Sequence, residues 1–225
     1  MKYVIPAKRS SSRVPEKNFR PFANGKSLLD ILVTKLSRIA DAPGDVYLSS
    51  EDESARLVAD RYGASFLPRP RHLTENSFPF QSVVNEVCRQ LPDDDDVMWC
   101  HATDPFFDEH EAVQKAWRSR DQAAADSIVV VYPMAEYLLD ANFHPLGFGF
   151  GAWHRPSQEL PTFYQLGFSC SIMTRHVATH LGLVGARPMW HRATKLTIDI
   201  DTQAQFDLAA RLYELGDRAT APEWT

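Results

Sequence analysis

The sequence lacks the features of membrane, secreted and nucleic-acid-binding proteins. No apolar run approaches the roughly 20 residues that a membrane-spanning helix needs. The first expected strand begins within two residues of Met1, which leaves no room for a secretory signal peptide. The net charge is -5 and the pI is near 5.9, so general nucleic-acid binding is not expected. We therefore expect a cytoplasmic protein whose partners are neither membranes nor nucleic acids.

Cysteine is also scarce. The three cysteines, Cys88, Cys100 and Cys170, are isolated from one another and show no Cys-X-X-Cys spacing. An odd number without that spacing argues against a disulfide framework and against a zinc site. Cys100 and Cys170 lie in apolar runs and are expected to be buried thiols, which suits a reducing compartment.

No internal repeat or low-complexity linker divides the 225 residues, so one domain over residues 1–225 is expected. Strand patterns alternate with helical patterns along the chain, and this order predicts an α/β fold with a mostly parallel sheet and helices on both faces. The expected strands cover residues 3–5, 45–50, 64–67, 97–100, 127–132 and 167–173. The expected helices cover residues 27–40, 51–62, 80–91, 108–120 with Asp108 as the cap, a segment from 175, and 205–215.

Two segments do not fit this alternation. Residues 134–164 alternate glycine with aromatic residues between prolines, which favours a protruding arm whose aromatic side chains meet another subunit. A packed surface loop explains the same pattern about as well.

The acidic run Asp93–Asp96 is the second such segment. It is expected to be a solvated turn and not a metal site, because four adjacent carboxylates cannot easily converge on one ion.

A basic, serine-rich loop follows the first strand. Lys8, Arg9, Arg13 and Lys17 bring four positive charges into ten residues, with three serines among them. The carboxyl end of a strand in an open α/β sheet is where phosphates bind, and cations complete such a pocket. A solvated basic loop is the alternative interpretation, since a charge cluster alone proves little.

Two aspartates lie near the end of the chain. Asp199 and Asp201 alternate with isoleucines, and in a strand residues i and i+2 point to the same face. Two adjacent carboxylates repel unless a cation lies between them, and Mg²⁺ takes one or two carboxylates together with substrate phosphate oxygens. Asp201 as the cap of the last helix is the alternative, but it does not explain Asp199. The basic loop and this pair together predict a site for a magnesium nucleotide.

These stretches resemble motifs of the cytidylyltransferases that make CMP-activated acid sugars, of the CMP-N-acylneuraminate synthetase type. The opening IPAKRSSSRVPEKN at residues 5–18 is similar to the family's first strand and loop, and IDIDT at 198–202 is similar to its closing motif. Between them, LSSE at 48–51, LPRP at 67–70 and WCHATDP at 99–105 match further motifs in the right order.

The resemblance implies a Rossmann-like nucleotidyltransferase fold with a mixed, mostly parallel sheet, usually a homodimer whose subunits exchange an arm. It implies a Mg²⁺-dependent enzyme that transfers CMP from CTP to an acidic acceptor, a 2-keto-3-deoxy acid sugar of the nonulosonic type, and releases pyrophosphate. Such a transfer requires positioning and charge neutralisation and no protein nucleophile, which agrees with the absence of a convincing Ser/His/Asp or Cys/His arrangement.

The resemblance also assigns residues to roles. For the nucleotide it implies Ala7, Lys8, Arg9, Ser11, Arg13, Lys17, Asn18, Arg69 and Ser82. For catalysis it implies Lys8, Lys17, Asp199 and Asp201, of which the two aspartates hold Mg²⁺, and for the acceptor His101, Thr103, Asp104, Phe168 and Ser169.

Three departures from the family pattern concern the loop and the acceptor half. Lys8 replaces the usual arginine and Arg9-Ser10 replace a glycine pair, although Arg9 could supply the missing guanidinium. His101 replaces glutamine, where it could contact an anion or simply be a hydrogen-bonded histidine, and Gly167-Phe168-Ser169 replace Asn-Gly-Ala/Ser. A small phosphonate or phosphate is therefore an alternative acceptor. A non-catalytic nucleotide-binding subunit on the same fold is the alternative to an enzyme.

Overall fold

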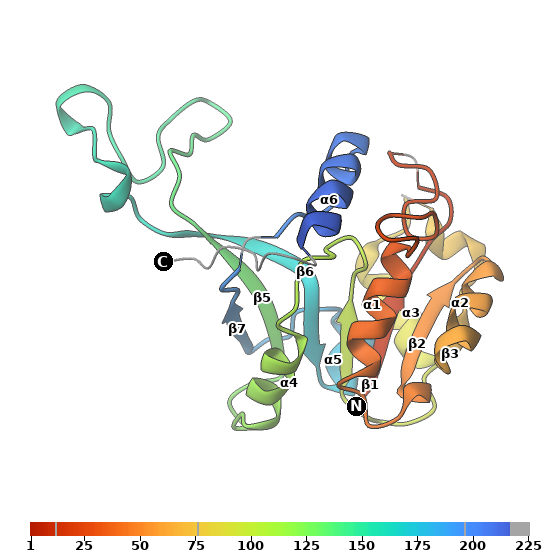
Figure 1. Ribbon diagram of the computed structural model, residues 1–225. Coiled ribbons are helices and arrows are strands. Elements are labelled where there is room, and N and C mark those ends of the chain that lie inside the picture. The colour runs from red at the N-terminus through yellow and green to blue at the C-terminus, as the bar shows by residue number, and fades with distance from the viewer. Residues whose placement is uncertain (12, 76, 196, 217–225) are drawn as a thin grey trace.

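The computed structural model describes residues 1–11, 13–75, 77–195 and 197–216. Within these ranges seven strands form one sheet in the order β3-β2-β1-β4-β6-β5-β7 (Figure 1). Within the described ranges, no helix has the length and apolar character needed to cross a bilayer. The sheet therefore organises the chain, and its connections place the loops considered below.

The sheet is mixed and mostly parallel, as predicted. The strands are β1 (Lys2–Pro6), β2 (Val46–Ser50), β3 (Ser65–Pro68), β4 (Val97–Cys100), β5 (Ser127–Met134), β6 (Phe163–Met173) and β7 (Pro188–Arg192). β1 pairs parallel with β2 and β4, β2 with β3, and β5 with β7. β6 runs antiparallel to both β4 and β5. The carboxyl ends of β1, β2, β3 and β4 therefore share one edge of the sheet.

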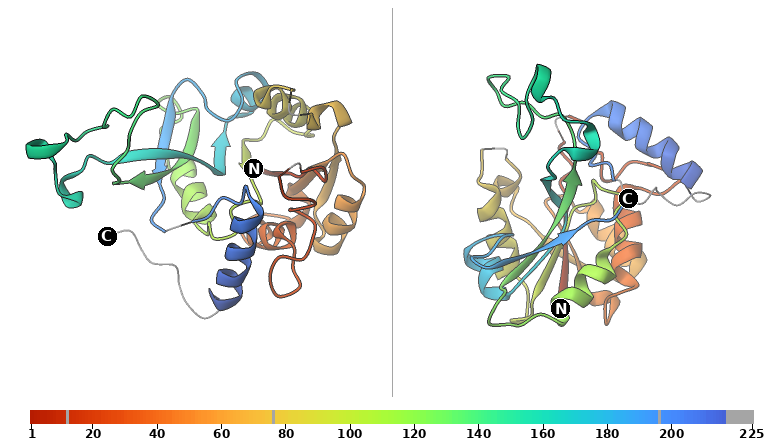
Figure 2. Two further views of the ribbon diagram at one scale, coloured as in Figure 1. Left: turned by 90° about the horizontal axis from the view of Figure 1, so that it is seen from above. Right: turned by 90° about the vertical axis from the view of Figure 1, so that its left-hand side faces the viewer.

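Helices cover both faces of the sheet (Figure 2). They are α1 (Leu28–Ser37), α2 (Ser54–Tyr62), α3 (Phe80–Arg89), α4 (His110–Arg118), α5 (Arg175–His180) and α6 (Gln203–Gly216), with short 3₁₀ turns at Pro43–Asp45, Arg71–Thr74, Gly151–Trp153 and Ser157–Glu159. Side chains of α1, α2, α4 and α6 share one buried cluster with Ile5 and Met98. Side chains of α3 and α5 share a second cluster with Val4 and Trp99 on the opposite face. Burial of apolar residues on both faces explains the continuous apolar strands of the sequence.

Local signals set several helix ends. Ser27 caps α1 in a capping box, in which its hydroxyl accepts from the Asp30 amide and the Asp30 carboxylate accepts from the Ser27 amide. Gly63 ends α2 in the left-handed conformation at φ 66°, which costs glycine little. The buried free thiols of Cys100 and Cys170 also confirm the prediction made from their apolar surroundings.

Two sequence predictions about elements were wrong, and one strand was missed. Asp108 does not cap a helix: α4 begins at His110 after Glu109, and the Asp108 carboxylate pairs with Lys195 Nζ at 2.9 Å. The last strand is β7, which was not predicted. Asp199 and Asp201 follow it in an extended segment without strand pairing. This edge strand contains the exposed Trp190 and ends at Arg192, so it shows no apolar run from which a strand could be predicted.

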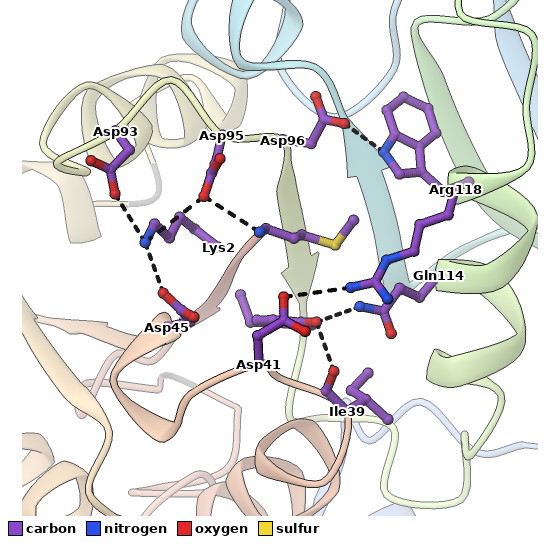
Figure 3. Close-up of polar contacts among 12 residues, drawn as sticks. Lys2, Ile39, Asp41, Asp45, Asp93, Asp95, Asp96, Gln114 and Arg118 are labelled. Carbon is purple, nitrogen blue, oxygen red and sulfur yellow. Dashed lines mark hydrogen bonds and ion pairs between the residues drawn. The ribbon is translucent and has the colours of Figure 1, made fainter.

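The acidic run at residues 93–96 is a largely exposed turn, as predicted, and some of its carboxylates also contact the N-terminal strand. The Lys2 ammonium lies 2.7 Å from Asp45, 3.0 Å from Asp93 and 3.9 Å from Asp95 (Figure 3). Asp96 accepts from Trp117 Nε1 at 2.8 Å. The hydrogen bond to Asp45 is the largest cause that raises the pKa of Lys2 above its ordinary value. Among the described residues, no cluster of three or more His, Cys, Asp or Glu side chains is placed to hold a metal ion.

Residues 135–162 leave the sheet between β5 and β6 as a long extension, which we call the arm (Figure 1). Its pairing is limited to an isolated bridge between Leu139 and Pro145 among the described residues. Phe143, Phe150 and Trp153 are exposed, and Trp153 reaches 81% exposure. The arm therefore presents large aromatic surface away from the core of its own chain, and its contact with another subunit stays a prediction.

Lys35 of α1 holds the loop that follows β4. Its ammonium donates to the carbonyl oxygens of Pro105 at 2.6 Å and Phe107 at 2.7 Å. Burial lowers the pKa of Lys35 from 10.5 to about 8, although Asp104 and Asp108 oppose that shift. An unfolded chain keeps this proton up to the ordinary pKa, so the unfolded state binds more protons between pH 8 and 10.5 and folding becomes more favourable as pH rises through that window.

We predict that Lys35→Met removes this pH dependence. Between about pH 7.5 and about pH 9.5, the free energy of unfolding of the unaltered protein should rise by about 2 kcal/mol relative to that of the variant. Urea denaturation at the two pH values measures the difference. If the free energy of unfolding changes by the same amount in both proteins between these pH values, Lys35 does not titrate in this window.

Candidate functional site

A cavity of about 790 Å³ opens at the carboxyl ends of the parallel strands. Its walls come from the loop after β1, the segment between β3 and α3, the start of α3, the loop after β4, β6, and the segment before α6. The lining residues are Pro6, Lys8, Ser11, Arg13, Lys17, Asn18, Arg69, Leu73, Thr74, Glu75, Phe78, Phe80, Val83, His101, Ala102, Thr103, Phe168, Asp199 and Asp201. The structure thus brings the basic loop and the two aspartates to one cavity, although about 180 residues separate them in sequence.

Cations of the basic loop meet the aspartate segment directly. Arg13 Nη2 lies 2.8 Å from Asp201 Oδ1, and Lys17 Nζ lies 3.6 Å from the same oxygen. Lys17 Nζ also donates to the carbonyl oxygen of Ile200. Burial lowers the pKa of Lys17, and the negative charges of Asp201 and Asp199 oppose that effect. Opposite charges therefore line the same wall, where phosphates and a cation could be bound side by side.

The aspartates point to the cavity although no strand holds them. The Ile200 amide donates to the Thr103 carbonyl oxygen at 2.8 Å, and the Ile200 side chain is buried in the core. These two contacts hold the backbone extended at Ile200. Because neighbouring side chains of an extended segment point to opposite sides, Asp199 and Asp201 point away from the core and line the cavity. The alternation predicted from the sequence holds, but a single backbone hydrogen bond and a buried isoleucine produce it.

Asn18 and Arg69 bring buried polar groups to the cavity. Arg69 is 7% exposed, and its Nη2 donates to the Ala7 carbonyl oxygen at 2.9 Å. Asn18 Oδ1 and Arg69 Nε are buried and have no hydrogen-bond partner among the described residues. A buried polar atom without a partner costs about 1–3 kcal/mol. A ligand with one donor and one acceptor in these positions would recover that free energy.

Arg9 does not supply a guanidinium to this cavity. Its Nε donates to Glu16 Oε1 at 2.9 Å, and its Nη1 reaches Asp52 at 3.4 Å. Glu16 is the largest cause that raises the pKa of Arg9. The side chain instead lines a neighbouring hollow of about 500 Å³. Arg13 and Arg69 are the guanidinium groups on the cavity wall.

An aromatic wall lines the same cavity as the charged residues. The His101 ring stacks on Phe168 with 5.9 Å between centroids, and the edge of Phe80 meets the His101 ring at 5.7 Å. Trp99 Nε1 donates to His101 Nε2 at 2.8 Å. Burial first, and then Lys17 and Arg69, lower the pKa of His101 to about 4. The imidazole is therefore neutral at physiological pH with Nδ1 protonated, which makes it a hydrogen-bond donor and not a cation.

Four other residues with expected roles lie away from the cavity wall. Ala7 is buried below it and contributes its carbonyl to Arg69. Ser82 is half-buried on α3, between the lining residues Phe80 and Val83. Asp104 and Ser169 are buried and bond to each other. Thr103 and Phe168 are the other expected acceptor residues besides His101, and both line the cavity.

Several lining residues were missed from the sequence. Leu73, Thr74, Glu75 and Phe78 belong to the connection between β3 and α3, and Phe80 begins α3. They form no motif of charged or metal-binding residues, so their types alone indicated only a loop. Their position in the chain could have identified them, because they follow the carboxyl end of a parallel strand, where ligands bind in open α/β sheets.

A sequence model of the family described as "Cytidylyltransferase" matches residues 3–145. The match spans the basic loop, Arg69 and the segment after β4, and ends before the aspartate pair. None of the curated proteins compared with the chain matches it.

Solved structures share the fold at low sequence identity. One is "CMP:2-keto-3-deoxy-manno-octonic acid synthetase complexed with CTP", at a TM-score of 0.65 and 14% identity over 94% of this chain and 97% of that chain. A second is a putative glucose-1-phosphate thymidylyltransferase from Bacillus anthracis, with a TM-score of 0.64 and 14% sequence identity over 95% of both chains. A third is the 4-diphosphocytidyl-2C-methyl-D-erythritol synthase of Anaerococcus prevotii. Its TM-score is 0.63 and its sequence identity is 11%, over 95% of this chain and 98% of that chain.

These structures establish a nucleotidyltransferase-like α/β fold. The family match covers more than half of the chain and includes the loop that supplies the cations of the cavity. The chain belongs to the cytidylyltransferase family.

Proposed function

We propose that this cytidylyltransferase transfers CMP from CTP to an oxygen of an acidic acceptor and releases pyrophosphate. One observation carries the proposal: Lys8, Arg13 and Lys17 line the same cavity as the Asp199 and Asp201 carboxylates. Nucleotidyl transfer requires a protein to position a polyanion and to neutralise its charge. The cavity offers groups of both signs for that purpose.

The basic loop is proposed to bind the triphosphate. Lys8, Arg13 and Lys17 supply the positive charge, and Ser11 lines the same wall. Because Arg13 and Lys17 are paired with Asp201, phosphate oxygens would compete with that carboxylate for the same cations. Asn18 and Arg69 are proposed to recognise the nucleoside, which would satisfy the buried Asn18 Oδ1 and Arg69 Nε atoms.

Asp199 and Asp201 are proposed to hold Mg²⁺. Two carboxylates beside a phosphate-binding wall fit this ion, which takes few protein ligands together with phosphate oxygens and water. The donor set is oxygen only, which suits magnesium better than softer metals. When bound, the ion would neutralise charge on the transferred phosphate and acidify the attacking hydroxyl.

The chemistry requires no protein nucleophile. The acceptor oxygen forms a bond to the α-phosphorus of CTP, and where that oxygen belongs to a hydroxyl its proton passes to water. The bond from the phosphorus to the bridging oxygen breaks, and pyrophosphate leaves with the electron pair. Lys8 and Lys17 are proposed to stabilise the charge on the phosphates as this bond breaks. Neutral His101 is proposed to orient the acceptor by donating a hydrogen bond from Nδ1.

We propose a 2-keto-3-deoxy acid sugar of the nonulosonic type as the acceptor. The aromatic wall of Phe80, His101 and Phe168 suits the apolar face of a sugar ring, and Thr103 adds a hydroxyl. The similar fold of CMP:2-keto-3-deoxy-manno-octonic acid synthetase, complexed with CTP, supports an acid sugar. The alternative is a small phosphonate or phosphate, which the similar fold of 4-diphosphocytidyl-2C-methyl-D-erythritol synthase favours.

Pyrophosphate release tests the activity and the aspartate pair together. With CTP, Mg²⁺ and a panel of acid sugars, phosphonates and phosphate esters, we expect release with at least one acceptor. Asp201→Asn should lower that rate by about 100-fold or more, because a charge-stabilising group is lost. Asp207→Asn, an exposed position on α6, should leave it unchanged.

Three outcomes would contradict the assignment. No release with any acceptor would favour a non-catalytic nucleotide-binding subunit. Release with ATP or GTP but not CTP would remove the cytidine specificity. Near-normal turnover of Asp201→Asn would remove that carboxylate from the metal site.

The triphosphate contact predicts a loss of CTP affinity in Lys17→Ala. A charge-assisted hydrogen bond contributes about 1.5–3 kcal/mol, so the dissociation constant should rise by roughly 10- to 100-fold. Titration calorimetry with CTP measures it. Lys26→Ala, which changes an exposed lysine between β1 and α1, is the matched control, and equal affinities in the two variants would contradict the contact.

We further propose a cytoplasmic homodimer formed through the arm. The buried free thiols suit a reducing compartment, and exposed aromatic side chains at the arm suit a subunit interface. Phe143→Ser combined with Trp153→Ser should convert the dimer to a monomer in analytical ultracentrifugation. Leu57→Ser, which changes an equally apolar side chain at 66% exposure on α2, should not. A monomeric unaltered protein would refute the interface.

A further inference from the structure

Buried Asp104 connects four parts of the chain next to the proposed metal ligands. It follows β4, is 5% exposed and does not line the cavity. Its Oδ2 accepts hydrogen bonds from Tyr132 Oη at 2.8 Å and from Ser169 Oγ. Its Oδ1 accepts from the Phe107 amide at 3.3 Å and from Thr197 Oγ1. One carboxylate therefore joins β5, β6, its own loop and the segment that carries Asp199.

The contacts to the aspartate segment occur on both sides of Asp199. Thr197 lies two residues before it and bonds to the Asp104 carboxylate. Ile200 lies one residue after it, and its amide bonds to the Thr103 carbonyl oxygen at 2.8 Å. These contacts restrain a segment that has no strand pairing of its own. Side-chain hydrogen bonds that orient metal ligands commonly alter metal affinity by about 10- to 100-fold.

We propose that Asp104 is a positioning residue, which acts through Thr197 to hold the Asp199 and Asp201 carboxylates in the geometry that binds a divalent cation. The inference rests on the proposed metal site and replaces the acceptor contact expected of Asp104 from the sequence. Asp104 and Ser169 then serve the cation and not the acceptor, because both point into the buried hydrogen-bond network.

The network contains a matched pair of hydroxyl donors for a test. Thr197 donates to one carboxylate oxygen and belongs to the aspartate segment. Tyr132 donates to the other oxygen and belongs to β5. Thr197→Val and Tyr132→Phe each remove one hydroxyl from Asp104 while keeping the side-chain shape. Asp104 itself is a poor choice for replacement, since four donors would lose their common acceptor.

The experiment measures binding of Mn²⁺ alone, with free Mn²⁺ quantified by electron paramagnetic resonance, together with the melting temperature. Thr197→Val should raise the Mn²⁺ dissociation constant by about tenfold, and Thr197→Ser, which keeps the hydroxyl, should restore it. Tyr132→Phe should lower the melting temperature but change the dissociation constant by less than about twofold.

The outcomes separate this inference from the proposed function. If the unaltered protein binds Mn²⁺ and Thr197→Val behaves like Tyr132→Phe, the positioning role is overturned while the metal site stands. If the unaltered protein does not bind Mn²⁺, the metal site fails and the positioning role fails with it.

Discussion

The position of β4 between a parallel and an antiparallel neighbour is the constraint on which the site depends. Its pairing with β1 brings the loops after both strands to the same edge of the sheet. Its pairing with β6 runs the other way, so β6 enters the sheet at that edge and places Phe168 beside His101. The loop after β4 then anchors the aspartate segment through Thr103 and Asp104. One strand thus relates the basic loop, the aromatic wall and the carboxylates.

Charge in the cavity is balanced within the protein itself. Lys17 is partly buried and bonded to the Ile200 carbonyl, and Asp201 lies between Lys17 and Arg13. The Arg13–Asp201 pair is exposed to solvent, and exposed ion pairs contribute only about 0–1 kcal/mol, so a phosphate can replace the carboxylate on Arg13 at low cost. The stronger constraints lie below the surface, where Lys35 holds two loop carbonyls and Asp104 collects four donors. The ion pairs on the cavity wall can therefore be replaced by a ligand, while buried hydrogen bonds hold the loops beneath them in place.

Most of the fold could be predicted from the sequence because its signals are local. Ser27 and Gly63 mark helix ends, and the apolar runs of β4 and β5 mark buried strands. The edge strand β7 lacked such a run. For the site, the charges of Lys8, Arg13, Lys17, Asp199 and Asp201 indicated a common cavity, which the structure contains. The orientation of Arg9 toward Glu16, and of Asp104 toward Tyr132, depends on contacts between distant segments and could not be read from spacing.

The central claim is that one cavity holds the triphosphate against the basic loop and a divalent cation against the aspartate pair. A crystal structure of the protein with CTP and Mn²⁺, with the metal located by anomalous scattering, tests it most directly. The account predicts phosphate oxygens on Lys8, Arg13 and Lys17 and an anomalous peak beside Asp199 and Asp201. A triphosphate bound outside this cavity, or a metal that touches neither carboxylate, would contradict it.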